Sequence, residues 1–66
     1  MQVTINGKTQ AVKAGITIAE LLTQLDLQPI RVAVEVNEDL VLRKTFADTS
    51  VNEGDRIEIV TLVGGG

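Results

Sequence analysis

One helical apolar stripe, set among stretches that alternate between polar and apolar residues, decides which folds this chain can adopt. Ile18, Leu21, Leu22 and Leu25 recur at the spacing that places them on one face of a helix. In the stretches on either side, polar and apolar residues alternate, as they do in strands that bury one face. A single amphipathic helix must cover its stripe with another layer, and here only a sheet is available. We therefore predict an α+β fold in which one main helix packs on one face of a mixed four- to five-stranded sheet.

The helix carries its own start and stop signals. Thr17 is a good N-cap residue, and Glu20 follows three residues later, so the two together predict a capping box. Pro29 disfavours helical backbone at the residue before it. The helix is therefore expected to end near Asp26.

The expected strands cover residues 2–5, 8–12, 31–36, 40–42 and 56–63. Asn6-Gly7 between the first two strands predicts a type I′ hairpin, because both central positions of that turn need positive φ. A two-residue turn would pair Ile5 with Lys8 and would leave Lys8 and Gln10 on the apolar face. A bulged turn would avoid this, so the register of this hairpin stays open. The last strand is expected to lie beside the first, which makes the sheet mixed.

Residues 43–52 show no clean period. We expect Phe46 and Val51 to reach the core from this irregular segment. Turns are predicted at residues 37–39 and 53–55.

Both of these turns carry paired acidic residues, Glu38 with Asp39 and Glu53 with Asp55. Neither pair has the ligand spacing of a calcium loop. The chain has no His that could support acid–base chemistry by these carboxylates. We interpret all four as solvated turn residues.

Composition excludes most chemistry within the chain itself. The chain has no Cys, and therefore neither a thiolate nucleophile nor a thiolate metal site. It has no His, so it lacks the commonest metal ligand and the commonest general base. We expect no catalytic side chain, no metal site and no cofactor bound by this chain.

Charge and hydropathy limit the partners. Nine acidic residues against six basic ones give a net charge of −3, which argues against binding a phosphate backbone. The one aromatic residue, Phe46, offers no stacking platform for single-stranded nucleic acid. No apolar run approaches the ~20 residues that a membrane span needs, and Met1 leads into a strand pattern rather than a secretory signal. We predict a single cytoplasmic domain that binds neither nucleic acid nor membrane.

The C-terminal carboxylate is the most plausible reactive group. Three glycines follow the last predicted strand directly, so we divide the chain into a domain of residues 1–63 and a flexible tail of residues 64–66. Glycine lacks Cβ and can thread a narrow slot, and three residues reach about 10 Å. A free carboxylate is ionised at neutral pH and must first be activated, for example as an acyl adenylate. The alternative is a frayed terminus without a role.

The open face of the last strand is a candidate docking surface. If Ile57 and Ile59 face the helix, alternation places Val60 and Leu62 on the opposite face, beside the tail. Apolar side chains there would present the tail to a partner, and we assign partner contacts to Val60, Leu62 and Val63. The alternatives are that neighbouring side chains cover these residues, or that scattered exposed apolar residues carry no function.

Taken together, these motifs resemble the ThiS family, the sulfur carriers of the thiamine pathway, which have the ubiquitin-like β-grasp fold. The resemblance covers the whole chain. It is carried by the Asn-Gly hairpin, the Thr-Ile-Ala-Glu-Leu-Leu helix start, the Val-Ala-Val-Glu-Val-Asn strand, the Gly-Asp turn before the last strand, and the terminal Val-Gly-Gly-Gly. The chain also resembles the small subunit of molybdopterin synthase, but its short length and its ending favour the thiamine branch.

The resemblance implies a chemistry for the tail. An E1-like adenylyltransferase would use Mg-ATP to adenylate Gly66, and a cysteine desulfurase or another persulfide sulfur donor would supply the sulfur of a thiocarboxylate. The carrier would then donate sulfide to thiazole synthase, as a co-substrate rather than an enzyme. Gly66 maps onto the terminal glycine of the family and would need no processing. Gly65 maps onto the penultimate glycine, and Gly64 extends the arm that enters the partners' active sites.

Other roles stay open at this point. They are sulfur donation to molybdopterin or another acceptor, a ubiquitin-like modifier that forms isopeptide bonds to lysines, and a β-grasp interaction module with an inert tail. The sequence identifies neither the sulfur source nor the oligomeric state nor the partner affinities.

Overall fold

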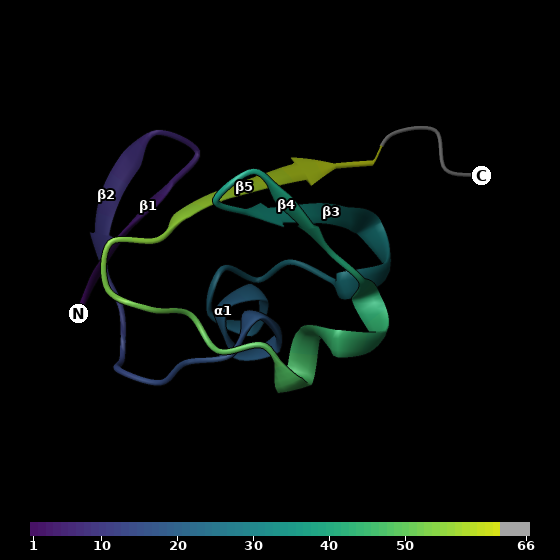
Figure 1. Ribbon diagram of the computed structural model, residues 1–66. Helices are drawn as coiled ribbons and strands as arrows, with labels where there is room; N and C mark the ends of the chain where they lie inside the picture. The colour runs from purple at the N-terminus through teal and green to yellow at the C-terminus, as the bar shows by residue number, and fades with distance from the viewer. Residues whose placement is uncertain (63–66) are drawn as a thin grey trace.

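Five strands form one mixed sheet in the order β2-β1-β5-β3-β4 in the computed structural model, which describes residues 1–62 (Figure 1). The strands are β1 (Gln2–Ile5), β2 (Lys8–Ala11), β3 (Val32–Val36), β4 (Asp39–Val41) and β5 (Arg56–Thr61). Central β5 runs parallel to β1 and antiparallel to β3. The predicted α+β fold and the mixed sheet are therefore confirmed.

The first hairpin has the simple two-residue register. Ile5 pairs with Lys8, and Val3 pairs with Gln10. Asn6 and Gly7 have φ values of 50° and 84°, as a type I′ turn requires. No bulge is needed, because β2 is an edge strand. Its Lys8 is exposed and its Gln10 is half-buried, so the polar ends of both side chains can stay in water while their stems lie on the inner face.

Helix α1 (Ile18–Gln24) begins with the predicted capping box. The Thr17 N–H donates to Glu20 Oε1 over 2.9 Å, and the Glu20 N–H donates to Thr17 Oγ1 over 3.1 Å. The helix ends slightly earlier than expected. Asp26 has a left-handed φ of 59°, and the N–H groups of Asp26 and Leu27 donate to carbonyls inside the last turn. This is the Schellman pattern, so the local turn ends the helix before Pro29 can.

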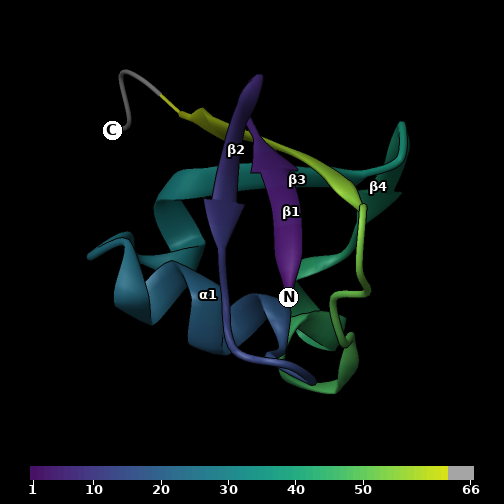
Figure 2. The same cartoon turned by 90° about the vertical axis from the view of Figure 1, so that its left-hand side faces the viewer.

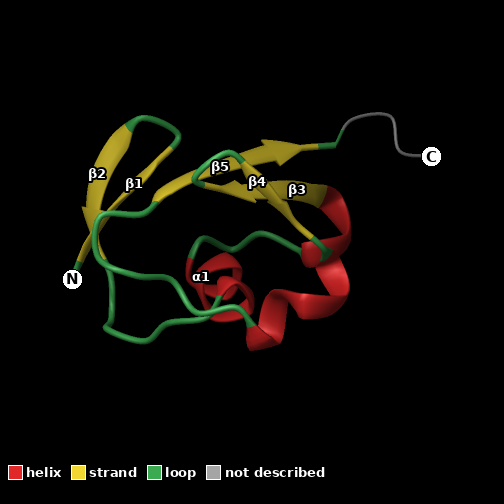
Figure 3. Cartoon of the chain, in the orientation of Figure 1, coloured by secondary structure: helices red, strands yellow, loops and turns green. Residues whose placement is uncertain are grey.

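The core lies between the sheet and α1, which covers one face of it (Figure 2). Its members are buried apolar side chains from β1, β3, β5, α1 and the loops, namely Val3, Ile5, Ile16, Ile18, Leu21, Leu22, Val32, Val34, Phe46, Val51, Ile57 and Ile59. Phe46 and Val51 are 3% and 2% exposed, which confirms that the irregular segment reaches the core. Residues 43–48 of that segment form a 3₁₀ helix, η2 (Arg43–Asp48), on the same side of the sheet as α1 (Figure 3). A shorter 3₁₀ helix, η1 (Pro29–Arg31), precedes β3.

The second hairpin is tighter than predicted. Asn37 and Glu38 both have positive φ, 52° and 73°, and Val36 pairs with Asp39. The turn therefore has two central residues rather than three, and Asp39 belongs to β4.

Asp55 corrects one sequence interpretation. It was expected to be solvated, but it is 9% exposed and is the one buried polar or charged residue among residues 1–62. Its Oδ2 accepts from the Asn52 N–H over 2.8 Å, and its Oδ1 accepts from Asn37 Nδ2 over 3.0 Å. A buried carboxylate needs such donors, and one of these two comes from the β3–β4 hairpin. Asp55 therefore ties the turn before β5 to the β3–β4 turn.

Candidate functional site

The two faces of β5 divide as the sequence predicted. Ile57 and Ile59 are buried against α1, with 0% and 8% exposure, whereas Val60 and Leu62 are 58% and 48% exposed on the open face. Glu58 is also exposed. Neighbouring side chains therefore do not cover Val60 and Leu62, and both are available to a partner.

The exposed apolar surface is larger than the sequence indicated. Ala33 on β3 lies directly opposite Val60 and so shares its face. Leu40 and Leu42 are 63% and 52% exposed. Together with Ala33 and Leu62 they line a shallow hollow of about 210 Å³. We call Ala33, Leu40, Leu42, Val60 and Leu62 the open-face patch.

Leu40 and Leu42 were missed as site residues, although alternation held the signal. Val41 is half-buried and packs against the core. Its two neighbours in an extended segment must then point to the other face. The sequence predicted a strand here but did not fix which face was buried.

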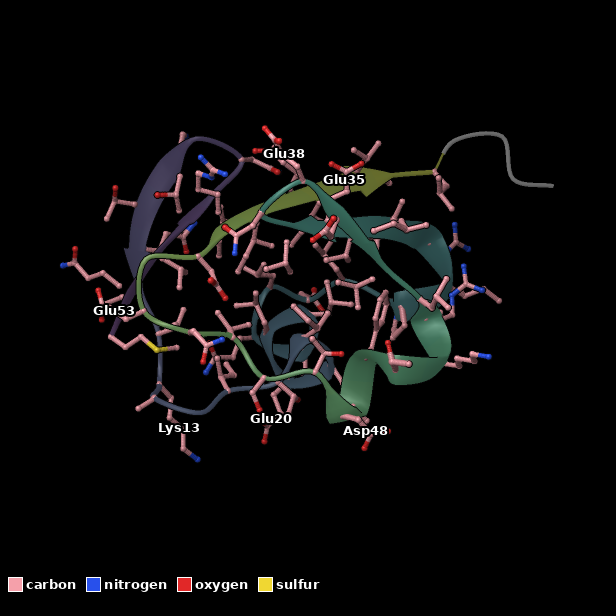
Figure 4. All side chains as sticks on the ribbon, in the orientation of Figure 1. Lys13, Glu20, Glu35, Glu38, Asp48 and Glu53 are labelled. Carbon is pink, nitrogen blue, oxygen red and sulfur yellow. The ribbon has the colours of Figure 1, made fainter. Side chains whose placement is uncertain are left out.

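Acidic side chains border the open-face patch. Glu35 on β3 lies directly opposite Glu58 on β5, and Leu40 lies opposite Glu35 on its other side. Figure 4 shows Glu35 and Glu38 on the side of the sheet away from α1. Like charges directly opposite each other on a sheet are destabilising. The open face thus combines exposed apolar surface with acidic side chains, and Arg43 adds a positive charge at the hollow.

Leu62, the last described residue, is still hydrogen-bonded to the neighbouring segment of the sheet. The Leu62 N–H donates to the Arg31 carbonyl over 2.7 Å, so the ladder between β5 and the start of β3 continues one step beyond Thr61. Val63, Gly64, Gly65 and Gly66 lie outside the described residues. Their assigned roles remain predictions.

Glu20 lies away from the open face, in the helical layer with Lys13 and Asp48 (Figure 4). The hydrogen bond from the Thr17 N–H lowers the pKa of the Glu20 carboxyl below its ordinary value. That shift belongs to the capping box rather than to a reaction site. Within residues 1–62, no three acidic side chains gather where they could hold a metal ion. The helices in this part of the chain are too short or too polar to cross a bilayer.

Comparisons with known proteins point to one family. The sequence model of the ThiS family matches residues 3–66. The sulfur carrier protein ThiS of Escherichia coli is 35% identical over 66 residues, which is the full length of both chains. A thiazole synthase of Paramagnetospirillum magneticum is 39% identical over 66 residues, but this chain spans only 20% of the length of that protein.

A solved structure extends the likeness to the fold. The crystal structure of the thiamine biosynthesis protein ThiS from Geobacter metallireducens is 36% identical, covers all of both chains and superposes with a TM-score of 0.86. The predicted ubiquitin-like β-grasp fold is therefore confirmed.

Proposed function

The chain belongs to the ThiS family, the sulfur carriers of thiamine biosynthesis, and we propose that it carries sulfur as a thiocarboxylate on Gly66. The observation that carries the proposal is the end-to-end similarity to a protein named as a sulfur carrier. The composition agrees, because a chain without Cys or His has few side chains suited to catalysis. We propose that the protein is a co-substrate of other enzymes.

The proposed chemistry uses the α-carboxylate of Gly66. A carboxylate oxygen attacks the α-phosphorus of Mg-ATP on an E1-like adenylyltransferase, which releases pyrophosphate and leaves an acyl adenylate. A persulfide sulfur, from a cysteine desulfurase or another donor, attacks the acyl carbon and expels AMP. A thiol then cleaves the S–S bond and leaves the sulfur on Gly66, while the donor becomes a disulfide. Mg-ATP is bound by the adenylyltransferase, and no step needs a nucleophile from residues 1–62.

Thiazole synthase is the acceptor that we propose. The support is that a protein named thiazole synthase contains a segment similar to this whole chain. Joining a carrier to its acceptor keeps the two at a high effective concentration, which is useful if one delivers sulfur to the other. We propose that docking through the open-face patch brings this carrier to the same kind of acceptor.

The open-face patch suits this docking role because of where it lies. Val60 and Leu62 are exposed within the last three described residues. A partner that covers them is therefore close to the start of the tail. We propose that Gly64 and Gly65 then enter the partner's active site, and that Val63 adds to the contact.

The test is an activation assay with a mass readout. The full chain is incubated with the adenylyltransferase, Mg-ATP and a persulfide donor, and its C-terminal peptide is analysed. We expect the mass gain of one oxygen replaced by sulfur, located on Gly66. A chain that lacks Gly65 and Gly66 is the control, and it should keep the fold and show no gain. No gain in the full chain, with an enzyme proven active on another ThiS-family carrier, would overturn the proposal.

The acceptor is tested separately. The thiocarboxylate form is offered to thiazole synthase and to the large subunit of molybdopterin synthase. Consumption by thiazole synthase supports the proposed acceptor, and consumption by the other enzyme alone rejects it. High-mass adducts that disappear when Gly66 is deleted would instead indicate a protein modifier.

A further inference from the structure

Strand β5 extends beyond β1, the neighbouring strand that pairs with one of its edges. β1 pairs with β5 only at Thr4 with Arg56 and at Ile5 with Ile57. β1 then ends at the Asn6-Gly7 turn, whereas β5 runs on to Thr61. Because the Leu62 N–H points to β3, alternation directs the N–H and C=O of Ile59 to the opposite edge, where no strand remains.

The side chain of Asn6 fills this gap. Its Oδ1 accepts from the Ile59 N–H over 2.8 Å, and its Nδ2 donates to the Ile59 carbonyl over 3.1 Å. Its backbone N–H donates to the Ile57 carbonyl over 2.9 Å. A carboxamide presents the same donor and acceptor as a peptide group. Asn6 therefore stands in for the next residue of β1 while its own backbone makes the turn.

The turn alone does not explain an asparagine here. The φ of 50° at Asn6 lies in the left-handed region, which Asn, Asp and Gly all tolerate. Of these three, only Asn offers both a donor and an acceptor to Ile59. Asn6 therefore meets two requirements at once: the turn needs a residue that tolerates positive φ, and Ile59 of β5 needs both a donor and an acceptor.

We propose that Asn6 is a positioning residue for the tail. It holds Ile59 in the sheet and so fixes Val60 to Leu62, from which the tail continues, before a partner docks. The proposed role acts through the hydrogen bonds of Asn6 to Ile59. The inference rests on the proposed function, because fixing the exit of the tail matters only if the tail is used.

The molecule contains a matched control at the other end of β5. Asn37 is also a turn residue with left-handed φ, 52°. Its side chain also makes two hydrogen bonds, accepting from the Arg56 N–H over 2.9 Å and donating to Asp55 over 3.0 Å. Asn37→Gly thus removes the same number of bonds, but at the start of β5, away from the tail.

The experiment compares Asn6→Gly, Asn6→Asp and Asn37→Gly in the full chain. Each is measured by urea unfolding, by hydrogen exchange of the Ile59 amide, and by the kcat and KM of adenylation with the adenylyltransferase and Mg-ATP. Asn6→Asp keeps the turn and an acceptor for Ile59, but it sets a carboxylate oxygen against the Ile59 carbonyl. This variant keeps the test valid if Asn6→Gly unfolds.

We expect both Asn6 variants to speed exchange at Ile59 and to raise KM by about three- to tenfold, the factor for a loss near 1 kcal/mol in docking. Their kcat should hold, because the ordering is required when the carrier binds. Asn37→Gly should lose at least as much stability, because it also removes a donor from buried Asp55, and it should keep its KM. Equal KM changes in all three variants, or none in any, would overturn the inference while adenylation of the unsubstituted chain upholds the proposed function. No adenylation of the unsubstituted chain overturns both.

Discussion

At the scale of single residues, Glu20 at the start of α1 makes the free energy of unfolding depend on pH in the acidic range. The hydrogen bond from the Thr17 N–H lowers the pKa of Glu20 below its ordinary value of 4.5. A carboxylate with a lowered folded pKa stabilises the fold above its unfolded pKa, and this is lost as pH falls through the folded pKa. Glu20→Gln keeps a capping box with an uncharged side chain. This variant should therefore lose less stability than the unsubstituted protein as the pH falls below 4.5. Urea unfolding at pH steps checks this, and parallel losses in both proteins would contradict it.

Asp55 shows, at the same scale, where sequence reasoning stops. In the sequence Glu53 and Asp55 are alike, two acids flanking a turn glycine. In the structure Glu53 is exposed and Asp55 is buried. Asp55 accepts from the nearby Asn52 N–H and also from Asn37, which lies 18 residues away. No local pattern carries that partner, so the sequence could not separate the two carboxylates.

At the scale of elements, local signals predicted what local interactions determine. The capping box and the Asn6-Gly7 turn are each formed by residues within a few positions of one another, and both were found in the sequence. Element ends were less well predicted. β4 begins at Asp39 because of its pairing with β3, and η2 lies in a segment without a period. The same holds for the candidate site. Alternation along the last strand predicted that Val60 and Leu62 are exposed, whereas the place of Leu40 beside them depends on how the strands pair in the sheet.

The pairing of β3 with β5 places Glu35 and Glu58 directly opposite each other. Glu58→Gln should therefore raise the free energy of unfolding by roughly 0.2–1 kcal/mol, and more at low salt than at high salt. Glu35→Gln should do the same. The double variant should gain little over either single one, because one neutral partner already removes the repulsion. Urea unfolding of the four proteins completes this cycle, and additive gains would show that the two carboxylates do not interact.

At the scale of the whole molecule, a small core on one face of the sheet leaves apolar residues exposed on the other face. A chain of this size buries only about 60% of its unfolded surface, and the twelve buried apolar residues among residues 1–62 all belong to the core. The helical side of the sheet also has a hollow of about 350 Å³, lined in part by Ile5, Ile59 and Leu25. The opposite face of the sheet is free to present the open-face patch, and the acids beside it add to a net charge of −3. The buried core therefore lies on one face of the sheet, and the exposed apolar patch lies on the other.

That division predicts which substitutions separate binding from folding. Val60→Ser and Leu62→Ser should each weaken binding to the adenylyltransferase by about five- to tenfold, as loss of a well-packed interface residue does. Their stability should stay within about 0.5 kcal/mol, because both side chains are exposed. Ile30→Ser is the control, since Ile30 is 67% exposed on η1 and lies outside the sheet. Calorimetric titration measures the affinities. If Ile30→Ser weakens binding as much as Val60→Ser and Leu62→Ser, apolar exposure in general would be responsible, and the open-face patch would not be the docking site.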